Sequence, residues 1–116
     1  MNRYPRYTSE QWFGAPPTAL IAESKDLPLA ATFAELGVPS SVTRVLSSQG
    51  IEEPFEVQTV AIPDALAGRD ICGRAPTGSG KTIAFGIPVI VRTAGSRPKA
   101  PSALVLAPTR ELAEQI

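Results

Sequence analysis

The chain has 116 residues, of which 43% are hydrophobic and 19% charged, and its formal net charge is zero. Such a composition is that of a soluble globular protein and excludes a wholly disordered one. A single cysteine, Cys72, excludes an internal disulfide, the lack of histidine argues against a zinc-type metal site, and no apolar run approaches the roughly 20 residues that span a bilayer.

The charge is unevenly distributed along the chain. Residues 1–68 carry four basic and eight acidic side chains, whereas residues 69–116 carry seven basic and three acidic ones. This asymmetry suggests that the second half binds anions. From the charge alone, however, an ordinary solvated surface is the simpler interpretation.

Residues 1–30 show no sustained hydrophobic period and contain several prolines. We expect them to form a flexible N-terminal extension. The first residues, MNRYPRYTSEQW, also lack the apolar core of a secretory signal, so a cytoplasmic location and no membrane partner are expected.

The next two segments follow the helical period. In residues 38–50, Pro39 fits the first turn of a helix and Gly50 its end. The apolar residues on one side of this helix are Val42, Val45 and Leu46. After Phe55 a second helix is predicted, with an apolar side made of Val57, Ala61, Ile62, Ala65 and Leu66. Pro63 interrupts this pattern and should bend the helix or mark a restart.

A strand and a helix are predicted next. Residues 70–75, DICGRA, are small and mostly apolar and predict a strand on which Cys72 is buried. A glycine-rich loop follows, and then a helix over 81–91 that Gly86 and Pro88 weaken locally.

The last segments complete an alternation of strands and helices. Residues 102–108, SALVLAP, predict a buried parallel strand, and a further helix begins at 109. The alternation predicts an α/β fold with a parallel sheet. Because two strands are too few to bury both faces of a sheet, we expect the chain to be the beginning of a larger lobe, incomplete at its C-terminus.

The glycine-rich loop has the residue types of a phosphate-binding loop. It lies between the predicted strand and helix, the context that such a loop requires, and consists of Ala75, Pro76, Thr77, Gly78, Ser79, Gly80, Lys81 and Thr82. The two glycines allow turns that point N–H groups inward as an anion site. Lys81 can reach the β- and γ-phosphates of a nucleoside triphosphate, and the Thr82 hydroxyl can coordinate Mg²⁺.

Two patterns do not match this loop. The strict phosphate-loop pattern has a glycine where Ala75 stands, which is tolerable if the position needs only a small side chain. The dinucleotide fingerprint G-x-G-x-x-G fails because Ile83 stands in place of its third glycine. A nucleoside triphosphate site is therefore the better interpretation.

Three motifs together resemble a known family. APTGSGKT followed by AFGIP resembles the alanine-led Walker A motif of DEAD-box RNA helicases. GIEEPFEVQTVAIP resembles that family's Q motif, with Gly50, Pro54 and Gln58 at matching positions, and APTRELAEQ resembles its motif Ia. Phe33 stands where the family keeps an isolated upstream aromatic residue. The resemblance covers residues 33–116 and implies that 31–116 is the beginning of a RecA-like P-loop NTPase lobe.

The resemblance also implies the site. Phe33, Gln58 and the loop 75–82 would bind ATP, with Lys81 and Thr82 as catalytic residues and Thr82 on Mg²⁺. A glutamine can pair with both N6 and N7 of adenine, whereas guanine loses one of these pairings. The residues that would bind the backbone of single-stranded RNA are Pro108, Thr109, Arg110 and Glu111.

Two residues depart from the family's Q motif. Ile51 stands in place of the usual aromatic residue, and Phe55 in place of a threonine or serine. Phe55 either covers the adenine by packing or fills the core.

The function expected from the resemblance is that of the ATP-binding portion of an RNA helicase that remodels RNA with ATP hydrolysis. The family is enzymatic, but we expect these 116 residues alone to lack turnover, because they contain no Asp-Glu-Ala-Asp motif and no second lobe with arginine fingers. The alternatives are a non-catalytic module that binds nucleotide or RNA and, more distantly, another P-loop NTPase such as a kinase.

Overall fold

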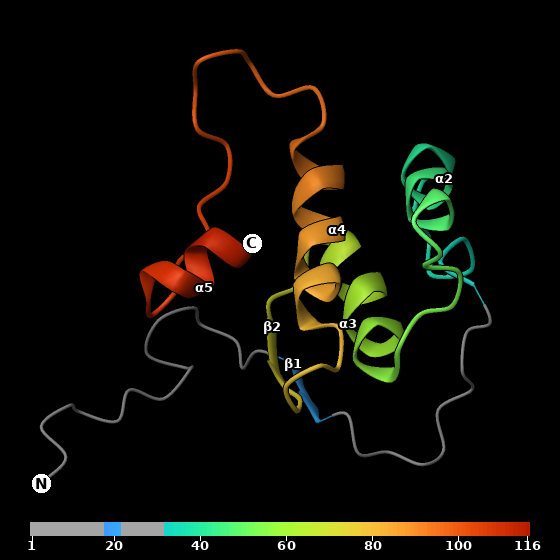
Figure 1. The fold of residues 1–116 in the computed structure, drawn as a ribbon. Helices are drawn as coiled ribbons and strands as arrows, with labels where there is room; N and C mark the ends of the chain where they lie inside the picture. The colour runs from blue at the N-terminus through green and yellow to red at the C-terminus, as the bar shows by residue number, and fades with distance from the viewer. Residues whose placement is uncertain (1–17, 22–31) are drawn as a thin grey trace, which may run out of the picture.

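The computed structural model describes residues 18–21 and 32–116 (Figure 1). Its elements are strand β1 (Thr18–Ile21), helix α2 (Ser40–Ser48), helix α3 (Glu56–Leu66), strand β2 (Ile71–Arg74), helix α4 (Lys81–Thr93) and helix α5 (Arg110–Gln115). Helices α3 and α4 lie side by side, and β2 packs beside α3, so the strand–loop–helix unit is built against the helix that precedes it. In this described part of the chain, no helix is both long enough and apolar enough to cross a membrane.

Helix α2 forms as predicted, but it contacts the core along a narrower face. Pro39 precedes its first turn, and Gly50 follows its end with a φ of 75°. Val42 and Leu46 pack against the core, whereas Val45 is 55% exposed. The core therefore meets only one edge of the apolar stripe.

Helices α3 and α4 both continue through a proline. Pro63 neither ends nor restarts α3, and α4 passes Pro88 and ends at Thr93, two residues beyond its predicted end. An interior proline costs about 3 kcal/mol because it removes one backbone hydrogen bond and crowds the preceding turn. The apolar contact between the two helices offsets this cost, since Ile62 and Ile87 are both buried in it.

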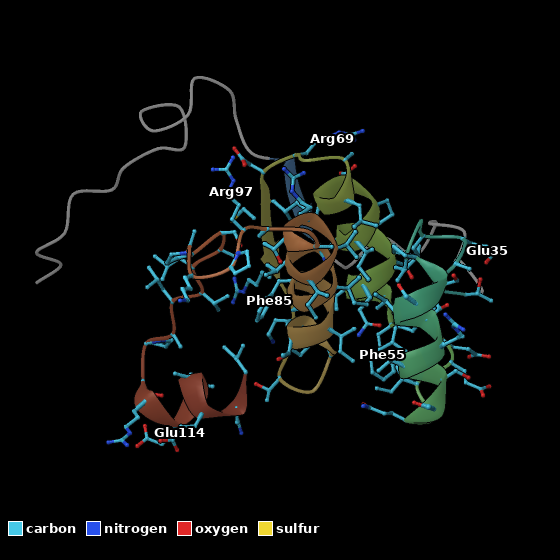
Figure 2. All side chains as sticks on the ribbon, turned by 90° about the horizontal axis from the view of Figure 1, so that it is seen from above. Glu35, Phe55, Arg69, Phe85, Arg97 and Glu114 are labelled. Carbon is cyan, nitrogen blue, oxygen red and sulfur yellow. The ribbon has the colours of Figure 1, made fainter. Side chains whose placement is uncertain are left out.

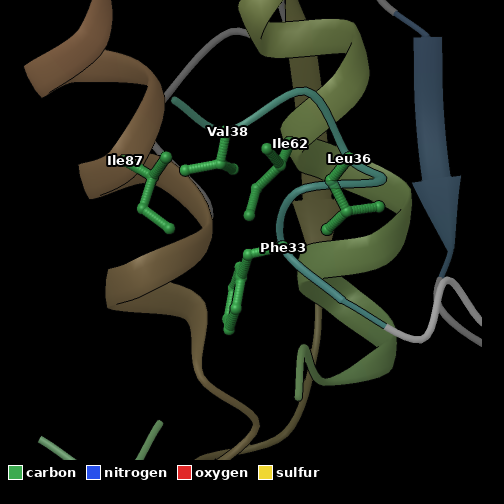
Figure 3. Packing of buried hydrophobic residues seen from close by; sticks show 5 residues of the cluster. All are labelled: Phe33, Leu36, Val38, Ile62 and Ile87. Carbon is green, nitrogen blue, oxygen red and sulfur yellow. The ribbon is translucent and has the colours of Figure 1, made fainter. Parts of the chain in front are cut away.

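The core lies where the turn at residues 32–37 meets these helices (Figure 3). Its buried side chains are Phe33, Leu36, Val38, Ile62 and Ile87. Ile62 is 0% exposed and Phe33 only 3% exposed. The segment that precedes α2 therefore packs against both α3 and α4 and completes the core between them.

The predicted sheet is only partly present in the described residues. Strand β2 forms at the predicted place, but its partner is β1, in parallel register from Thr18 opposite Ile71 to Ile21 opposite Arg74. Residues 102–108 form no strand, so that prediction was wrong. A strand has to pair its N–H and C=O groups with neighbours, and this segment has no neighbouring strand among the described residues.

The burial predicted for Cys72 was also wrong. Cys72 lies on β2 as expected, but it is exposed. A parallel strand becomes buried only when elements cover both faces of its sheet. The flexible extension predicted for residues 1–30 contains β1, and its other residues lie outside the described part of the chain, so its flexibility stays a prediction.

Candidate nucleotide-binding site

The loop between β2 and α4 has the backbone shape that its glycines predict. Gly78 and Gly80 have φ values of 80° and 82°, in the left-handed region that favours glycine. At Gly80 the space is also closed, because an added Cβ would collide with Gln58 Nε2 and lie 2.8 Å from Phe55 Cδ2. Gly80 is thus required both for the turn and for the close approach of α3.

Lys81 lies over its own loop. Its Nζ donates to the carbonyl oxygens of Ala75 and Pro76, each at 2.6 Å, and the Ser79 hydroxyl donates to the Pro76 carbonyl at 2.7 Å. The ammonium group is exposed and held at the mouth of the loop. A phosphate oxygen is a stronger acceptor for a lysine than a neutral carbonyl, so an incoming phosphate can replace these contacts.

The start of α4 offers further groups that suit a polyphosphate with its metal. The N–H groups in the first turn of a helix have no partner within the helix, and those of Lys81 and Thr82 have no acceptor among the described residues. The Thr82 side chain is exposed, and its hydroxyl bonds to no group in residues 32–116. A free hydroxyl oxygen is a ligand that Mg²⁺ accepts, so the residues present fit a nucleoside triphosphate with Mg²⁺.

Gln58 joins the start of α3 to the end of the loop. Its side chain is buried, with 1% exposure, so its contact with a nucleotide stays a prediction. Its Oε1 accepts from the Phe55 N–H at 2.8 Å, and its Nε2 donates to the Gly80 carbonyl oxygen at 3.0 Å. The two contacts differ in sense, so they fix which end of the amide is oxygen and which is nitrogen.

The two phenylalanines singled out from the sequence have different surroundings. Phe33 packs in the core (Figure 3), where its ring leaves almost no surface for a ligand, so its contact with a nucleotide stays a prediction. Phe55 is 60% exposed and lies beside Gly80. Of the two roles that the sequence allowed for Phe55, filling the core is therefore wrong.

A pocket in the described part of the chain is separate from this group of residues. It measures about 640 Å³ and lies between α3, α4 and β2, with Ser102 and Ala103 at its border. Of the loop it touches only Lys81, and neither Gln58 nor Phe55 lines it. Because the groups suited to a base and to phosphate gather around Gly80, we place the candidate site there.

The residues predicted to bind RNA stand apart from the loop. They lie at the start of α5, which is well separated from α3 and α4 in both views (Figures 1 and 2). Thr109 caps this helix by accepting from the Leu112 N–H at 3.3 Å, and Arg110 Nε donates to Glu114 Oε1 at 3.0 Å. Pro108 and Glu111 are exposed. The structure thus brings Gln58 to the phosphate loop but leaves residues 108–111 outside it.

Sequence reasoning missed the contact of Phe55 with the loop. Phe55 and Gly80 are 25 positions apart, and only the packing of α3 against α4 brings them together. The one signal in the sequence was the departure from the Q motif at position 55.

A strand, a glycine-rich turn closed over its lysine, and a helix that begins at that lysine define a phosphate-binding loop, and with it the broad class of P-loop proteins. Comparison with known proteins narrows this class. A family model described as DEAD/DEAH box helicase matches residues 55–116, and the chain belongs to that family.

Named relatives agree with this assignment. The chain is 47% identical over 88 residues to DEAD-box ATP-dependent RNA helicase 9, mitochondrial, of Arabidopsis thaliana. This match covers 72% of the chain and 14% of the relative. It is 47% identical over 106 residues to DEAD-box ATP-dependent RNA helicase 36 of Oryza sativa subsp. japonica, a match that covers 88% of the chain and 21% of the relative. It is 48% identical over 85 residues to ATP-dependent RNA helicase DeaD of Escherichia coli K12, a match that covers 73% of the chain and 13% of the relative. The chain thus spans between 13% and 21% of the length of these relatives.

A solved structure supports the fold. The RNA helicase Prp28 from Chaetomium thermophilum, determined bound to ADP, matches with a TM-score of 0.69 and 41% identity over 79% of this chain and 24% of that one. The chain therefore has the RecA-like fold that the resemblance implied, while the finer prediction of a parallel sheet that includes residues 102–108 is not met in the described residues.

Proposed function

We propose that the chain is the ATP-binding portion of a DEAD-box RNA helicase, an enzyme that remodels RNA with ATP hydrolysis. The observation that carries the proposal is the phosphate loop held over Lys81 and joined through Gly80 to the buried amide of Gln58. Relatives with the names of ATP-dependent RNA helicases and the ADP-bound Prp28 structure support it.

Different residues of the loop bind the phosphates and the Mg²⁺ ion. Lys81 exchanges the carbonyls of Ala75 and Pro76 for the β- and γ-phosphates, and the N–H groups at the start of α4 hold the same anion. The Thr82 hydroxyl holds Mg²⁺, which when bound neutralises charge on the phosphates. Pro76, Thr77 and Ser79 shape the turn around them.

Gln58 supplies selectivity for adenine. After its contacts with Phe55 and Gly80, the amide keeps one N–H and one oxygen lone pair. These match N7 and the N6 amine of adenine. With guanine the fixed Oε1 would face O6, an acceptor against an acceptor, and the amide cannot turn over without losing both backbone contacts.

The remaining parts of the proposal extend beyond the loop. Residues 108–111 contact the backbone of single-stranded RNA. The 116 residues alone lack turnover. A cytoplasmic location stays a prediction, since the relatives include a helicase named as mitochondrial.

The test is Lys81→Ala in the full-length protein. We expect ATP hydrolysis in the presence of RNA to fall roughly a hundredfold or more, because the charge that stabilises the transferred phosphate is lost. A phosphate-release assay measures it, with Arg97→Ala, an exposed cation outside the loop, as the matched control.

Retained hydrolysis in Lys81→Ala would refute the assigned role of the loop. A wild-type protein that binds ATP and RNA without hydrolysis would instead favour the non-catalytic module.

A further inference from the structure

Phenylalanine is an unusual residue at the position that Phe55 occupies in the fold. It is the N-cap of α3, where serine, threonine, aspartate or asparagine normally accepts a hydrogen bond from the first turn. A phenylalanine ring cannot do so, and the only side chain that caps this helix start is Gln58, which accepts from the Phe55 N–H. The ring is also 60% exposed, so it adds little to the core.

The ring nevertheless lies at one defined place. It is beside Gly80, the last residue of the phosphate loop, and its own backbone N–H is held by Gln58 Oε1 at 2.8 Å. In Figure 2, Phe55 and Phe85 are on opposite sides of α4, so Phe55 faces away from the pocket that Phe85 lines. An exposed aromatic ring thus borders both the loop and the amide proposed to read the base.

We propose that Phe55 is a further binding contact for the nucleobase, its ring forming an apolar wall beside Gln58 against which adenine packs. The inference rests on the proposed function and adds a residue to it. A base that pairs with the Gln58 amide must come within about 3 Å of it. The Phe55 ring, held at the same helix start, then meets the flat base, and aromatic rings gain from such offset or edge contacts.

The proposal explains why a residue without a capping group stands at the N-cap of α3. A threonine at position 55 would satisfy a free N–H of α3 but offer no ring to the base. Phe55→Thr in the full-length protein should therefore change stability and binding in opposite directions. We expect the melting temperature without nucleotide to stay equal or rise, and the Kd for ATP and ADP to increase roughly three- to tenfold.

The measurements are thermal unfolding without ligand and calorimetric titration with ATP and with ADP. Phe55→Tyr keeps the ring and should bind both nucleotides as the wild type does. Inorganic tripolyphosphate, which has no base, should compete for the loop equally well in wild type and Phe55→Thr. Val45→Thr is the matched control, since it makes a similar change at a residue of α2 that is 55% exposed.

The outcomes separate this inference from the proposed function. Unchanged Kd values in Phe55→Thr, with normal binding by the wild type, would overturn the inference and leave the proposed function standing. A lower melting temperature together with an equal loss of ATP and tripolyphosphate binding would also overturn it, because Phe55 would then be structural. A wild-type protein that binds no adenine nucleotide would overturn both.

Discussion

At the scale of single residues, the Gln58 side chain makes two hydrogen bonds and has one proposed role in nucleotide binding. It accepts from the N–H at the start of α3, donates to the last carbonyl of the phosphate loop, and in the proposed function reads the base. Gln58 is only 1% exposed. Water therefore cannot easily take the place of its amide at the Phe55 N–H and the Gly80 carbonyl if the side chain is removed. A change at this residue should affect stability and selectivity together.

We expect Gln58→Ala in the full-length protein to bring the ATP-to-GTP affinity ratio close to one. It should also lower the free energy of unfolding by about 1–3 kcal/mol, since the Phe55 N–H and the Gly80 carbonyl each lose a buried partner. Competition titrations with the two nucleotides and chemical denaturation measure these effects.

Thr59→Ala is the control for this change. Thr59 is the next residue of α3, and its hydroxyl donates only to the Phe55 carbonyl at 3.3 Å. An ATP-to-GTP ratio in Gln58→Ala equal to that of the wild type would contradict the role in base selectivity.

Helix α5 behaves as a separate element. It has six residues, none of them buried, and its Arg110–Glu114 pair is 87% and 67% exposed. An exposed pair at this spacing contributes only about 0.3–0.5 kcal/mol. Arg110 can therefore leave Glu114 for an RNA phosphate at little cost.

Arg110→Ala in the full-length protein should weaken binding of single-stranded RNA without regard to sequence. The slope of log K against log salt should become shallower by roughly one unit, because one phosphate contact and its released counterion are lost. Fluorescence anisotropy over a series of salt concentrations measures this slope.

Glu114→Ala provides the matched comparison, since it frees Arg110 instead of removing it. We expect its RNA affinity to equal or exceed that of the wild type. A salt slope unchanged in Arg110→Ala would show that this side chain makes no phosphate contact.

At the scale of the whole molecule, the described part of the chain is well packed around α3 and α4 and open beyond α4. Leu104 and Leu106 are 82% and 83% exposed, and Ile90 on α4 is 61% exposed. Exposed apolar side chains of this kind mark surfaces that other elements cover. Such a surface is consistent with a chain that spans only 13% to 21% of the length of these relatives.

We expect the 116-residue chain, produced by itself, to self-associate through residues 104–106. Replacing Leu104 and Leu106 together by lysine should raise the monomeric fraction, because it removes the apolar contact and adds charge. Size-exclusion chromatography with light scattering measures the mass. Ser102→Lys adds charge without removing apolar surface and should change the mass little, and a strictly monomeric unmodified chain would disprove the expectation.

The local patterns predicted the helices well because each depends on residues close in sequence. Pro39 and Gly50 bracket α2, and the small residues of 75–80 predict the loop. The strand over 102–108 failed because an apolar run specifies burial but not the partner that provides it. Neither Pro63 nor Pro88 ended its helix, because contacts between α3 and α4 outweigh a local penalty.

The sequence by itself determined the phosphate loop, the three motifs and hence the family, because these are carried by residue types at fixed spacing. Only the tertiary structure decided that Phe33 lies in the core, that Phe55 lies beside the loop, and that the Gln58 amide has a fixed orientation. The Gln58 amide is held in part by the Phe55 N–H three positions away, but its bond to the Gly80 carbonyl, like the contact of Phe55 with the loop, joins groups more than 20 positions apart. Those groups meet only when α3 packs against α4.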